Sequence, residues 1–377
     1  MTELVTRIDN GIGRITLNRP QALHALTTGM CARMSEALTN WADDPAVRLV
    51  MVDHAEGTRG FCAGGDIRLA AQSGRGDGKA GEDFFAVEYR LNVLIKRFSK
   101  PYLAIMDGVT MGGGVGVSIH GSHRIATDNT LFAMPETGIG LFPDVGGSWF
   151  LPRLAGKPER FPKKWPHFLD QEERPKKDRE RRSDSIRSNS ALGLWLALTG
   201  ARLKGMDVAA AGIATHFVAA ADLAALKNRL LAGAAPDDAL MPYAQTVSEP
   251  SYAPHMAIIN HCFSEASVSA ILHALETSGD AWGRAQAEIL KTRSPMSLCV
   301  AYAQLRRGAN LTRFEDAMRM EYRLACHILR SHDFSEGVRA VLEDKDNAPV
   351  WLPATVTDVT GDMVEAMFAP VTPELQL

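Results

Sequence analysis

The first residues of the chain alternate between apolar and polar side chains, which is the pattern of a half-buried strand. Two such runs lie between Val5 and Leu17, and Asn10-Gly11 separates them. An Asn-Gly pair readily adopts the positive φ angles of a tight hairpin turn. The pattern therefore predicts a β-hairpin over residues 5–17.

The apolar spacing then changes to that of an amphipathic helix, with Thr27 or Thr28 as the candidate N-cap and a stop at residues 43–45. The apolar face of this predicted helix consists of Met30, Met34, Leu38 and Trp41.

Two short apolar runs, Leu49–Val52 and Tyr102–Met106, have the length of buried strands. Each leads toward a glycine-rich turn, at residues 64–65 and 112–114 respectively. A strand, a glycine turn and a helix in repeated order indicate an α/β fold with functional loops at the strand ends.

Beyond about residue 254 the pattern becomes mainly helical, and Thr312 with Glu315 predicts a capping box at the start of one helix. The apolar face of that helix consists of Phe314, Met318, Tyr322, Ala325 and Leu329. We expect a C-terminal helical subdomain packed on the α/β core.

Residues 158–190 interrupt the pattern because they are rich in Pro, Ser and charges of both signs. The few apolar residues in this segment cannot bury enough surface to offset the conformational entropy lost on ordering. A flexible insertion is therefore expected. The basic run Arg174–Arg182 could be a localisation or nucleic-acid patch, but interleaved acids favour a solvated linker. Ordered structure is expected to resume at Leu192. The predicted divisions are a core at 1–157, the insertion at 158–190, the end of the core at 191–253 and a helical region at 254–377.

The composition excludes few classes of protein, with 46% hydrophobic residues, 23% charged residues and a net charge of −3. Such a charge gives no general attraction to nucleic acid or to anionic membranes. The 5 cysteines form no CxxC pair, and no signal or transit pattern precedes Pro20. These features predict a reducing, cytoplasmic location and no membrane span.

The two glycine turns are the first candidates for chemistry, because glycine lets backbone N–H groups approach a ligand closely. Two converging N–H donors would form an oxyanion hole for a carbonyl oxygen. The alternative is that these glycines only permit tight packing. Neither turn has the spacing of a dinucleotide or phosphate-binding loop.

Two carboxylates follow in the apolar segment Phe132–Leu154, where Glu136 precedes a glycine-rich loop and Asp144 follows Pro143. Paired carboxylates can divide the roles of nucleophile or base and acid. Two alternatives remain: Glu136 is a solvent-exposed turn residue, and Asp144 caps a helix that begins near Gly147.

Three segments, Phe61–Arg68 (FCAGGDIR), Asp107–Gly116 and Phe132–Gly147, together resemble the crotonase (enoyl-CoA hydratase/isomerase) superfamily. Their closest similarity is to its 3-hydroxyisobutyryl-CoA hydrolase branch. The resemblance extends to Leu198–Val218, Met320–Leu329 and His332–Trp351. It implies a crotonase-like spiral of ββα repeats with a C-terminal helical subdomain. The insertion is absent from the family pattern, and the alternatives to a disordered loop are an ordered lid and a sequence artefact.

The resemblance assigns the oxyanion hole to the amides of Gly65 and Gly113. It places the catalytic acids at Glu136 and Asp144, and a third acid near the acyl group at Glu88, within FFxxEYxLN. The implied contacts to the CoA arm are Ala22, Leu23, Ala63, Asp66 and Ile67.

One departure from the pattern separates reaction types. Hydratases of the superfamily carry a glutamate where this chain has Gly116, and usually a glycine where it has Asp144. One acid is missing and another is supplied elsewhere, which favours thioester cleavage over addition of water to an alkene.

The predicted activity is therefore hydrolysis of a short β-hydroxyacyl-CoA, 3-hydroxyisobutyryl-CoA of valine catabolism being the first candidate. The alternatives are a hydratase or isomerase of the same fold and a non-catalytic acyl-CoA-binding protein. No cofactor is expected, because CoA is part of the substrate, and a homo-oligomer is left open. No metal motif is present, and His120 and His123 are interpreted as ordinary loop histidines.

Overall fold

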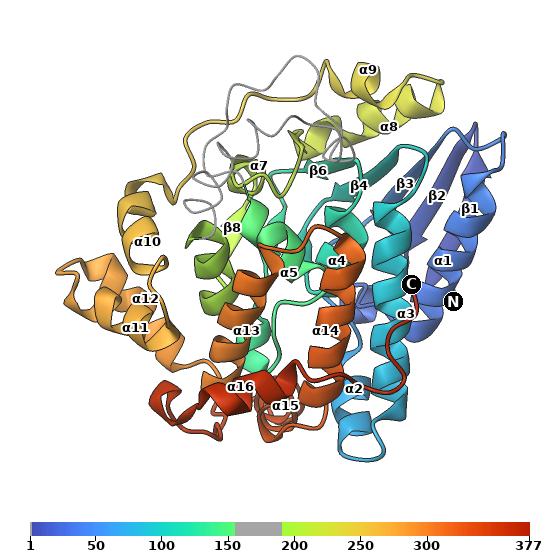
Figure 1. The fold of residues 1–377 in the computed structure, drawn as a ribbon. Coiled ribbons are helices and arrows are strands. Elements are labelled where there is room, and N and C mark those ends of the chain that lie inside the picture. Colours follow the sequence, from blue (N-terminus) through green and yellow to red (C-terminus); the bar gives the residue numbers. More distant parts are fainter. Residues whose placement is uncertain (1, 155–190) are drawn as a thin grey trace.

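The computed structural model describes residues 2–154 and 191–377 (Figure 1). The predicted insertion at 158–190, including Arg174–Arg182, lies outside the described residues.

The predicted hairpin is confirmed as strands β1 (Leu4–Asp9) and β2 (Ile12–Leu17), which pair antiparallel. Asn10 and Gly11 form the turn with φ angles of 47° and 78°. These values lie in the left-handed region, where asparagine and glycine are favoured.

The larger sheet has the strand order β1-β2-β3-β4-β6-β9, and every neighbouring pair after the hairpin is parallel. A smaller sheet has the order β5-β7-β8. The remaining strands of the larger sheet are β3 (Leu49–His54), β4 (Tyr102–Met106), β6 (His123–Ala126) and β9 (His216–Phe217). Those of the smaller sheet are β5 (Val109–Met111), β7 (Leu131–Ala133) and β8 (Leu203–Lys204). Both apolar runs predicted as strands are confirmed.

The predicted first helix is confirmed as α1 (Thr28–Ala42), and the Thr27 hydroxyl accepts a hydrogen bond of 3.2 Å from the Met30 amide. All four predicted apolar positions are buried. The helices that follow in the core are α2 (Ile67–Gly74), α3 (Lys79–Lys96), α4 (Gly113–Ile119) and α5 (Gly147–Phe150), with short 3₁₀ turns η1 (Pro20–Ala22), η2 (Glu136–Ile139) and η3 (Leu151–Arg153).

The chain repeats one unit, in which a strand of the larger sheet is followed by a short strand segment in the smaller sheet and then by a helical turn. Cys62, Thr110 and Phe132 occupy equivalent places in three successive units, because Cys62 bridges to Thr110 and Thr110 pairs with Phe132, both in parallel. Three residues beyond this row lie Gly65 and Gly113, and four beyond it lies Glu136. The register therefore brings the two glycine turns and the first predicted catalytic acid to one edge, as parallel strands require. This arrangement is the predicted spiral of ββα repeats.

The C-terminal part is helical and shares its core with the α/β part. Helices α13 (Pro295–Gly308) and α14 (Phe314–Ile328) pack beside α5 and α3, respectively (Figure 1). Residues 191–199 are helical, and the other helices are α7 (Met206–Ala210), α8 (Leu223–Leu231), α9 (Pro236–Leu240), α10 (Met256–Cys262), α11 (Val268–Thr277), α12 (Ala281–Lys291), α15 (His332–Val338) and α16 (Gly361–Met367). Shorter turns are η4 (Ala220–Asp222), η5 (Ala253–His255), η6 (Arg339–Glu343) and η7 (Val356–Asp358). Within the described chain, no helix combines the length and apolar character needed to cross a membrane.

The apolar face predicted for α14 is confirmed, because all five of its residues are buried. The predicted capping box is wrong: the N-cap is Arg313, whose side chain makes no cap, and Glu315 instead pairs with Arg97 of the α3 C-terminus. The ion pair of Glu315 with Arg97 takes the place of the predicted capping contact with Thr312. The predicted domain divisions themselves stay a prediction.

Gly114 packs closely against Cys62, and this contact can be tested by adding a side chain at residue 114. A Cβ atom on Gly114 would lie 2.8 Å from the Cβ of Cys62, a distance that packed side chains do not tolerate. We expect Gly114→Ala to lower the free energy of unfolding by about 1–3 kcal/mol in a urea titration. Gly29→Ala is the matched control, because residue 29 lies on the exposed face of α1 with only the Thr27 hydroxyl within 4 Å. That change should be neutral or stabilising by up to about 1 kcal/mol, and equal losses in both variants would contradict the packing argument.

Candidate active site

The two glycine turns meet at the edge of the smaller sheet. A Cβ atom on Gly113 would lie 3.1 Å from the carbonyl carbon of Gly64, and one on Gly112 would lie 3.2 Å from the Gly64 Cα. Within the described residues, the amides of Gly65 and Gly113 donate to no acceptor. Two unused N–H donors from adjacent turns are what an oxyanion hole requires.

Glu88 lies against both turns from helix α3. One of its oxygens, Oε1, would be 2.5 Å from a Cβ on Gly113 and 3.8 Å from a Cβ on Gly65. The side chain is 2% exposed, and Oε1 has no hydrogen-bond partner in the described part of the chain. The acid predicted to lie near the acyl group is therefore placed beside the predicted oxyanion hole.

Glu136 is the first residue of η2 and is 5% exposed. The alternative that it is a solvent-exposed turn residue is wrong, because its side chain is buried together with Met134 and Phe142 of the same segment. Its Oε2 has no hydrogen-bond partner among the described residues, and its Oε1 would lie 3.4 Å from a Cβ on Gly112. A buried carboxyl oxygen without a partner is costly to the fold and is available to a substrate.

Asp144 is also buried, and its Oδ2 accepts a 3.0 Å hydrogen bond from the Tyr89 hydroxyl. The alternative that Asp144 caps the next helix is wrong: the N-cap of α5 is Gly146, and no side chain at that position caps it. Tyr89 follows Glu88 on α3, so one helix positions two of the three acids.

The three acids influence one another's protonation. Burial, followed by the charges of Asp144 and Glu88, raises the pKa of Glu136 well above its ordinary value. Burial and the charge of Asp144 likewise raise the pKa of Glu88. Burial raises the pKa of Asp144 from 3.8 to about 7, although the Tyr89 hydroxyl opposes the shift. Carboxyls in such a cluster cannot all ionise together, so a carboxylate and a carboxylic acid coexist near neutral pH.

The loop that carries Asp144 is fixed by buried polar side chains from distant elements. Gln304 of α13 donates a 2.7 Å hydrogen bond to the Pro143 carbonyl. The ring nitrogen Nε2 of His120 lies 2.8 Å from the carbonyl oxygen of Val145. Val145 has a φ of 49°, which is unfavourable for a β-branched residue. Strain of this kind persists only where surrounding contacts over-determine it.

Glu321 of α14 supplies the cap that helix α5 lacks. Its Oε2 accepts a 2.7 Å hydrogen bond from the Gly146 amide, and its Oε1 accepts one of 2.9 Å from the Ser148 amide. Burial raises the pKa of Glu321 to about 8. A carboxyl from the C-terminal helices thus fixes the backbone directly after Asp144.

The interpretation of the two histidines as loop residues is wrong for His123, whereas His120 lies in the turn that ends α4. His120 is the C-cap of α4, and His123 begins β6. Burial lowers the pKa of His120 to about 3, so it stays neutral while it contacts Val145. Among the described residues, no three potential ligand side chains lie close enough together to hold a metal ion.

The segments predicted to contact the CoA arm lie side by side, joined by backbone hydrogen bonds. The Ala63 amide donates to the Leu23 carbonyl at 3.0 Å, and the Asp66 amide donates to the Leu26 carbonyl at 2.9 Å. The Asp66 side chain caps α2 and pairs with Arg19 at 3.2 Å, so it has a structural role in any case. Ala22 ends η1 and Ile67 begins α2, so all five predicted contacts border this junction.

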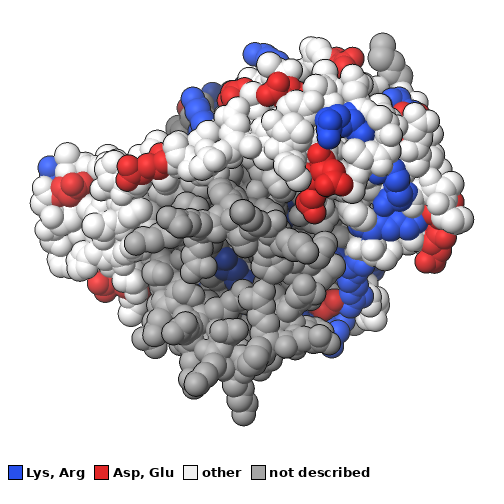
Figure 2. All heavy atoms as spheres, turned by 90° about the horizontal axis from the view of Figure 1, so that it is seen from above, with Lys and Arg blue, Asp and Glu red and all other residues white. Residues whose placement is uncertain are grey.

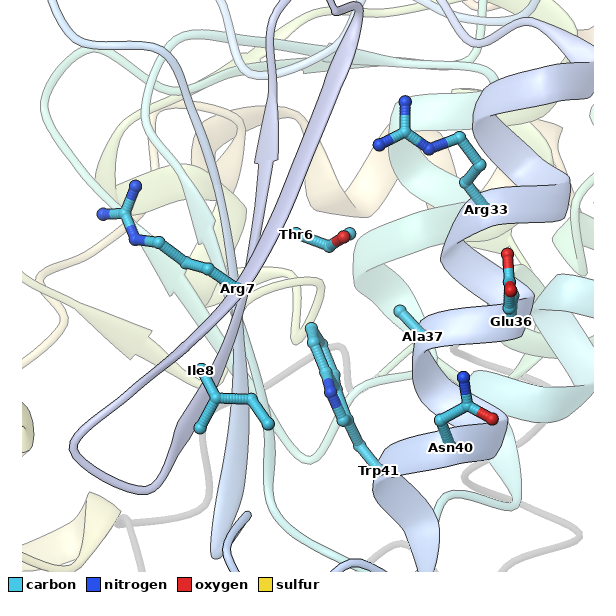
Figure 3. A pocket seen from close by; sticks show the side chains of 8 residues that line it. All are labelled: Thr6, Arg7, Ile8, Arg33, Glu36, Ala37, Asn40 and Trp41. Carbon is cyan, nitrogen blue, oxygen red and sulfur yellow. The ribbon is translucent and has the colours of Figure 1, made fainter.

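A groove of about 360 Å³ lies elsewhere, between β1 and α1. Figure 3 shows its lining side chains, which include Arg7, Arg33 and Trp41 but none of the predicted site residues. On the described part of the face seen from above, cationic and acidic side chains are interspersed (Figure 2). The absence of a nucleic-acid partner stays a prediction.

Sequence reasoning missed four polar residues of this region: Tyr89, Asn92, Gln304 and Glu321. Tyr89 and Asn92 lie in the segment FFxxEYxLN, and Glu321 lies in MEYRLACHIL, both of which carried the family resemblance. A polar residue within an apolar helical face was the available signal for Glu321. Gln304 offered no such signal, because its partner is a backbone carbonyl distant in sequence.

The contact between Glu321 and the Asp144 loop can be tested by removing one acceptor. In Glu321→Gln the amide N–H₂ would face a backbone N–H, so we expect a loss of about 1–3 kcal/mol in the free energy of unfolding. Glu36→Gln, on the exposed face of α1, is the control and should change nothing measurable. Equal stability of the two variants would show that Glu321 does not hold the loop.

The raised pKa of Asp144 predicts a pH dependence of stability. The folded state holds a proton on Asp144 up to about pH 7, whereas the unfolded chain releases it near pH 3.8. The folded state therefore binds more protons in this interval, and the free energy of unfolding falls as the pH rises through it. We expect Asp144→Asn to flatten part of this slope in urea titrations between those limits, and Glu36→Gln to leave it intact. An unchanged slope in Asp144→Asn would contradict the assignment.

Comparison with known proteins agrees with the geometry. The chain is 42% identical over 366 residues to the 3-hydroxyisobutyryl-CoA hydrolase, mitochondrial, of Xenopus laevis, covering 94% of this chain and 86% of that protein. It is 42% identical over 360 residues to the human protein of the same name, covering 93% and 84%. A crystal structure of a carnitinyl-CoA dehydratase from Mycobacterium thermoresistibile matches with a TM-score of 0.87 and 38% identity, covering 100% of this chain and 99% of that one.

The predicted cytoplasmic location is wrong by this comparison, because these relatives are named as mitochondrial proteins. Unpaired cysteines indicate a reducing environment but do not say which compartment provides it.

The family model for enoyl-CoA hydratase/isomerase matches residues 12–161 and 185–368, which include all the predicted catalytic residues. Together with the spiral of repeats and the relatives of similar length, this match shows that the chain belongs to the enoyl-CoA hydratase/isomerase family, the crotonase superfamily.

Proposed function

We propose that this protein hydrolyses a short β-hydroxyacyl-CoA, 3-hydroxyisobutyryl-CoA, and releases CoA and the free hydroxy acid. The proposal is supported by the names of the relatives that are 42% identical over almost the whole chain. The structural observation that supports it best is the lack of space for a side chain beside Gly116.

Gly116 occupies the position at which hydratases of the superfamily carry a glutamate. A Cβ atom here would lie 2.8 Å from Asn92 Nδ2 and 2.8 Å from the Cβ of Val145. A longer side chain would have to displace the Asn92 carboxamide and the Val145 side chain of the Asp144 loop. The site therefore has no room for the second acid of a hydratase, while Asp144 supplies a carboxyl from another direction.

The amides of Gly65 and Gly113 would bind the thioester carbonyl oxygen and stabilise the negative charge that develops on it. Each such donor typically contributes about 3 kcal/mol to a transition state. Both positions must be glycine: a Cβ on residue 65 would lie 2.6 Å from the Phe84 ring, and one on residue 113 would strike Glu88.

Glu136 would act as the nucleophile or the base, because its Oε1 lies beside Gly112 and its Oε2 has no hydrogen-bond partner among the described residues. In one route its carboxylate attacks the thioester carbon, expels the CoA thiolate and forms a mixed anhydride that water then hydrolyses. In the other route it takes a proton from the water that attacks the same carbon. Both routes require an ionised Glu136, although burial raises the pKa of this carboxyl in the protein without substrate.

Asp144 would protonate the departing thiolate. A carboxylic acid whose pKa is near 7 donates a proton effectively at neutral pH. The Tyr89 hydroxyl and the fixed loop hold this carboxyl in one orientation. The contacts that maintain the strained loop would keep the acid in place between turnovers.

A second candidate, addition of water to an enoyl-CoA, is favoured by the names of two structural relatives. They are the carnitinyl-CoA dehydratase and an enoyl-CoA hydratase from Rhodobacter sphaeroides, 38% and 34% identical to this chain. The experiment that separates the two is a thiol-release assay on 3-hydroxyisobutyryl-CoA beside a hydration assay on crotonyl-CoA. Hydration without thiol release would favour the second candidate, and binding without either reaction would indicate an acyl-CoA-binding protein.

Glu136→Gln tests the assigned nucleophile or base. The amide keeps the shape of the side chain but neither attacks nor accepts the proton, so kcat should fall by several orders of magnitude, roughly 10³-fold or more. Binding of the CoA ester, measured by calorimetry, should be nearly retained. The control is Glu36→Gln, which should keep the wild-type rate. If Glu136→Gln keeps more than about a tenth of wild-type turnover, Glu136 is not the group that acts on the thioester.

A further inference from the structure

Asn92 is a buried polar residue that the mechanism above does not use. It lies on α3 one turn after Glu88 and is 0% exposed. Neither its Nδ2 nor its Oδ1 has a hydrogen-bond partner in the described part of the molecule. A carboxamide buried without hydrogen bonds is costly to the fold, so a partner is expected in the functional state.

The surroundings of Asn92 place it within the site. Nδ2 lies 2.8 Å from the position of a Cβ on Gly116, where a hydratase glutamate would begin. Val145, the neighbour of Asp144 in the chain, lies against the same position at 2.8 Å. Asn92 is thus enclosed by α3, by α4 and by the Asp144 loop, each of which carries a residue assigned to the reaction.

Helices α3 and α4 pack so that Glu88 faces Gly113 and Asn92 faces Gly116. Residues four apart on α3 and three apart on α4 are neighbours on one helix face. The unpartnered Oε1 of Glu88 and the unpartnered amide of Asn92 therefore lie on the same side of α3, toward Gly113 and Gly116 of α4. An acyl chain whose carbonyl is held at Gly113 would extend past both.

We infer that the Asn92 carboxamide and the Glu88 carboxyl together bind the β-hydroxyl of the acyl group, which makes Asn92 a specificity-determining residue. The chemistry is complementary, because a hydroxyl both donates and accepts a hydrogen bond. Asn92 Nδ2–H donates to the hydroxyl oxygen, and the hydroxyl O–H is donated to Glu88 Oε1. A carboxylate offers only acceptors, and the neutral amide supplies a donor whatever the protonation of the three acids.

This inference rests on the proposed function and explains how the enzyme would select a β-hydroxyacyl-CoA over the plain acyl-CoA. A site built to hydrogen-bond a substrate hydroxyl discriminates strongly against the analogue without it, because its buried polar groups are then left unpaired.

Asn92→Leu tests the inference, since leucine has a similar volume but forms no hydrogen bond. The readout is the ratio of kcat/KM for 3-hydroxyisobutyryl-CoA to that for isobutyryl-CoA, which we expect to fall roughly 10- to 100-fold. Asn228→Leu, on the exposed face of α8, is the matched control and should keep the wild-type ratio. The dissociation constants of the same two CoA esters, measured in the Glu136→Gln background, separate the effect of Asn92→Leu on binding from its effect on turnover.

A wild-type ratio in folded Asn92→Leu would overturn the inference, as would equal losses on both substrates. Failure of Asn92→Leu to fold would also overturn it, because the amide would then serve the fold rather than the substrate. The proposed function fails by a different result, namely no thiol release from 3-hydroxyisobutyryl-CoA by the wild-type enzyme. The dissociation constants in the Glu136→Gln background do not depend on that result.

Discussion

The parallel register that aligns Cys62, Thr110 and Phe132 is the constraint on which the site depends. Because each repeat places its short strand beside the previous one, the residues that follow these strands emerge at a common edge. Gly65, Gly113 and Glu136 are such residues, although they are distant in the sequence. A shift of one residue in this register would turn the amides and the acid away from one another.

The site concentrates three carboxyls in an apolar interior, which opposes folding. Burial raises the pKa of each of them, and their mutual repulsion adds to the effect for Glu88 and Glu136. The structure offsets part of this cost with specific contacts, such as the hydrogen bond from Tyr89 to Asp144. The same environment that makes the acids costly also keeps one of them protonated at neutral pH, which a general acid requires.

The C-terminal helices complete the site. Glu321 of α14 and Gln304 of α13 hold the backbone on both sides of Asp144. These contacts support a residue, Val145, whose φ of 49° the local sequence would not favour. The α/β part supplies the two glycine turns and Glu136, and the helical part fixes the loop that carries Asp144.

The sequence by itself determined the local elements, because hairpin turns, helix caps and apolar periodicity depend on neighbouring residues. The Asn10-Gly11 hairpin, the Thr27 cap and the buried face of α14 follow from such patterns. The resemblance of its motifs to the crotonase superfamily also named the glycines and acids that the structure brings together.

The capping box at Thr312 failed because Arg97 of another helix pairs with Glu315, and local patterns do not report distant cations. Only the tertiary structure decided that Asp144 is held by Tyr89 and does not cap a helix, that Glu321 caps α5 and that Asn92 fills the space beside Gly116. The physical reason is that hydrogen-bond satisfaction and burial arise between segments far apart in the chain, where spacing along the sequence carries no information about contact.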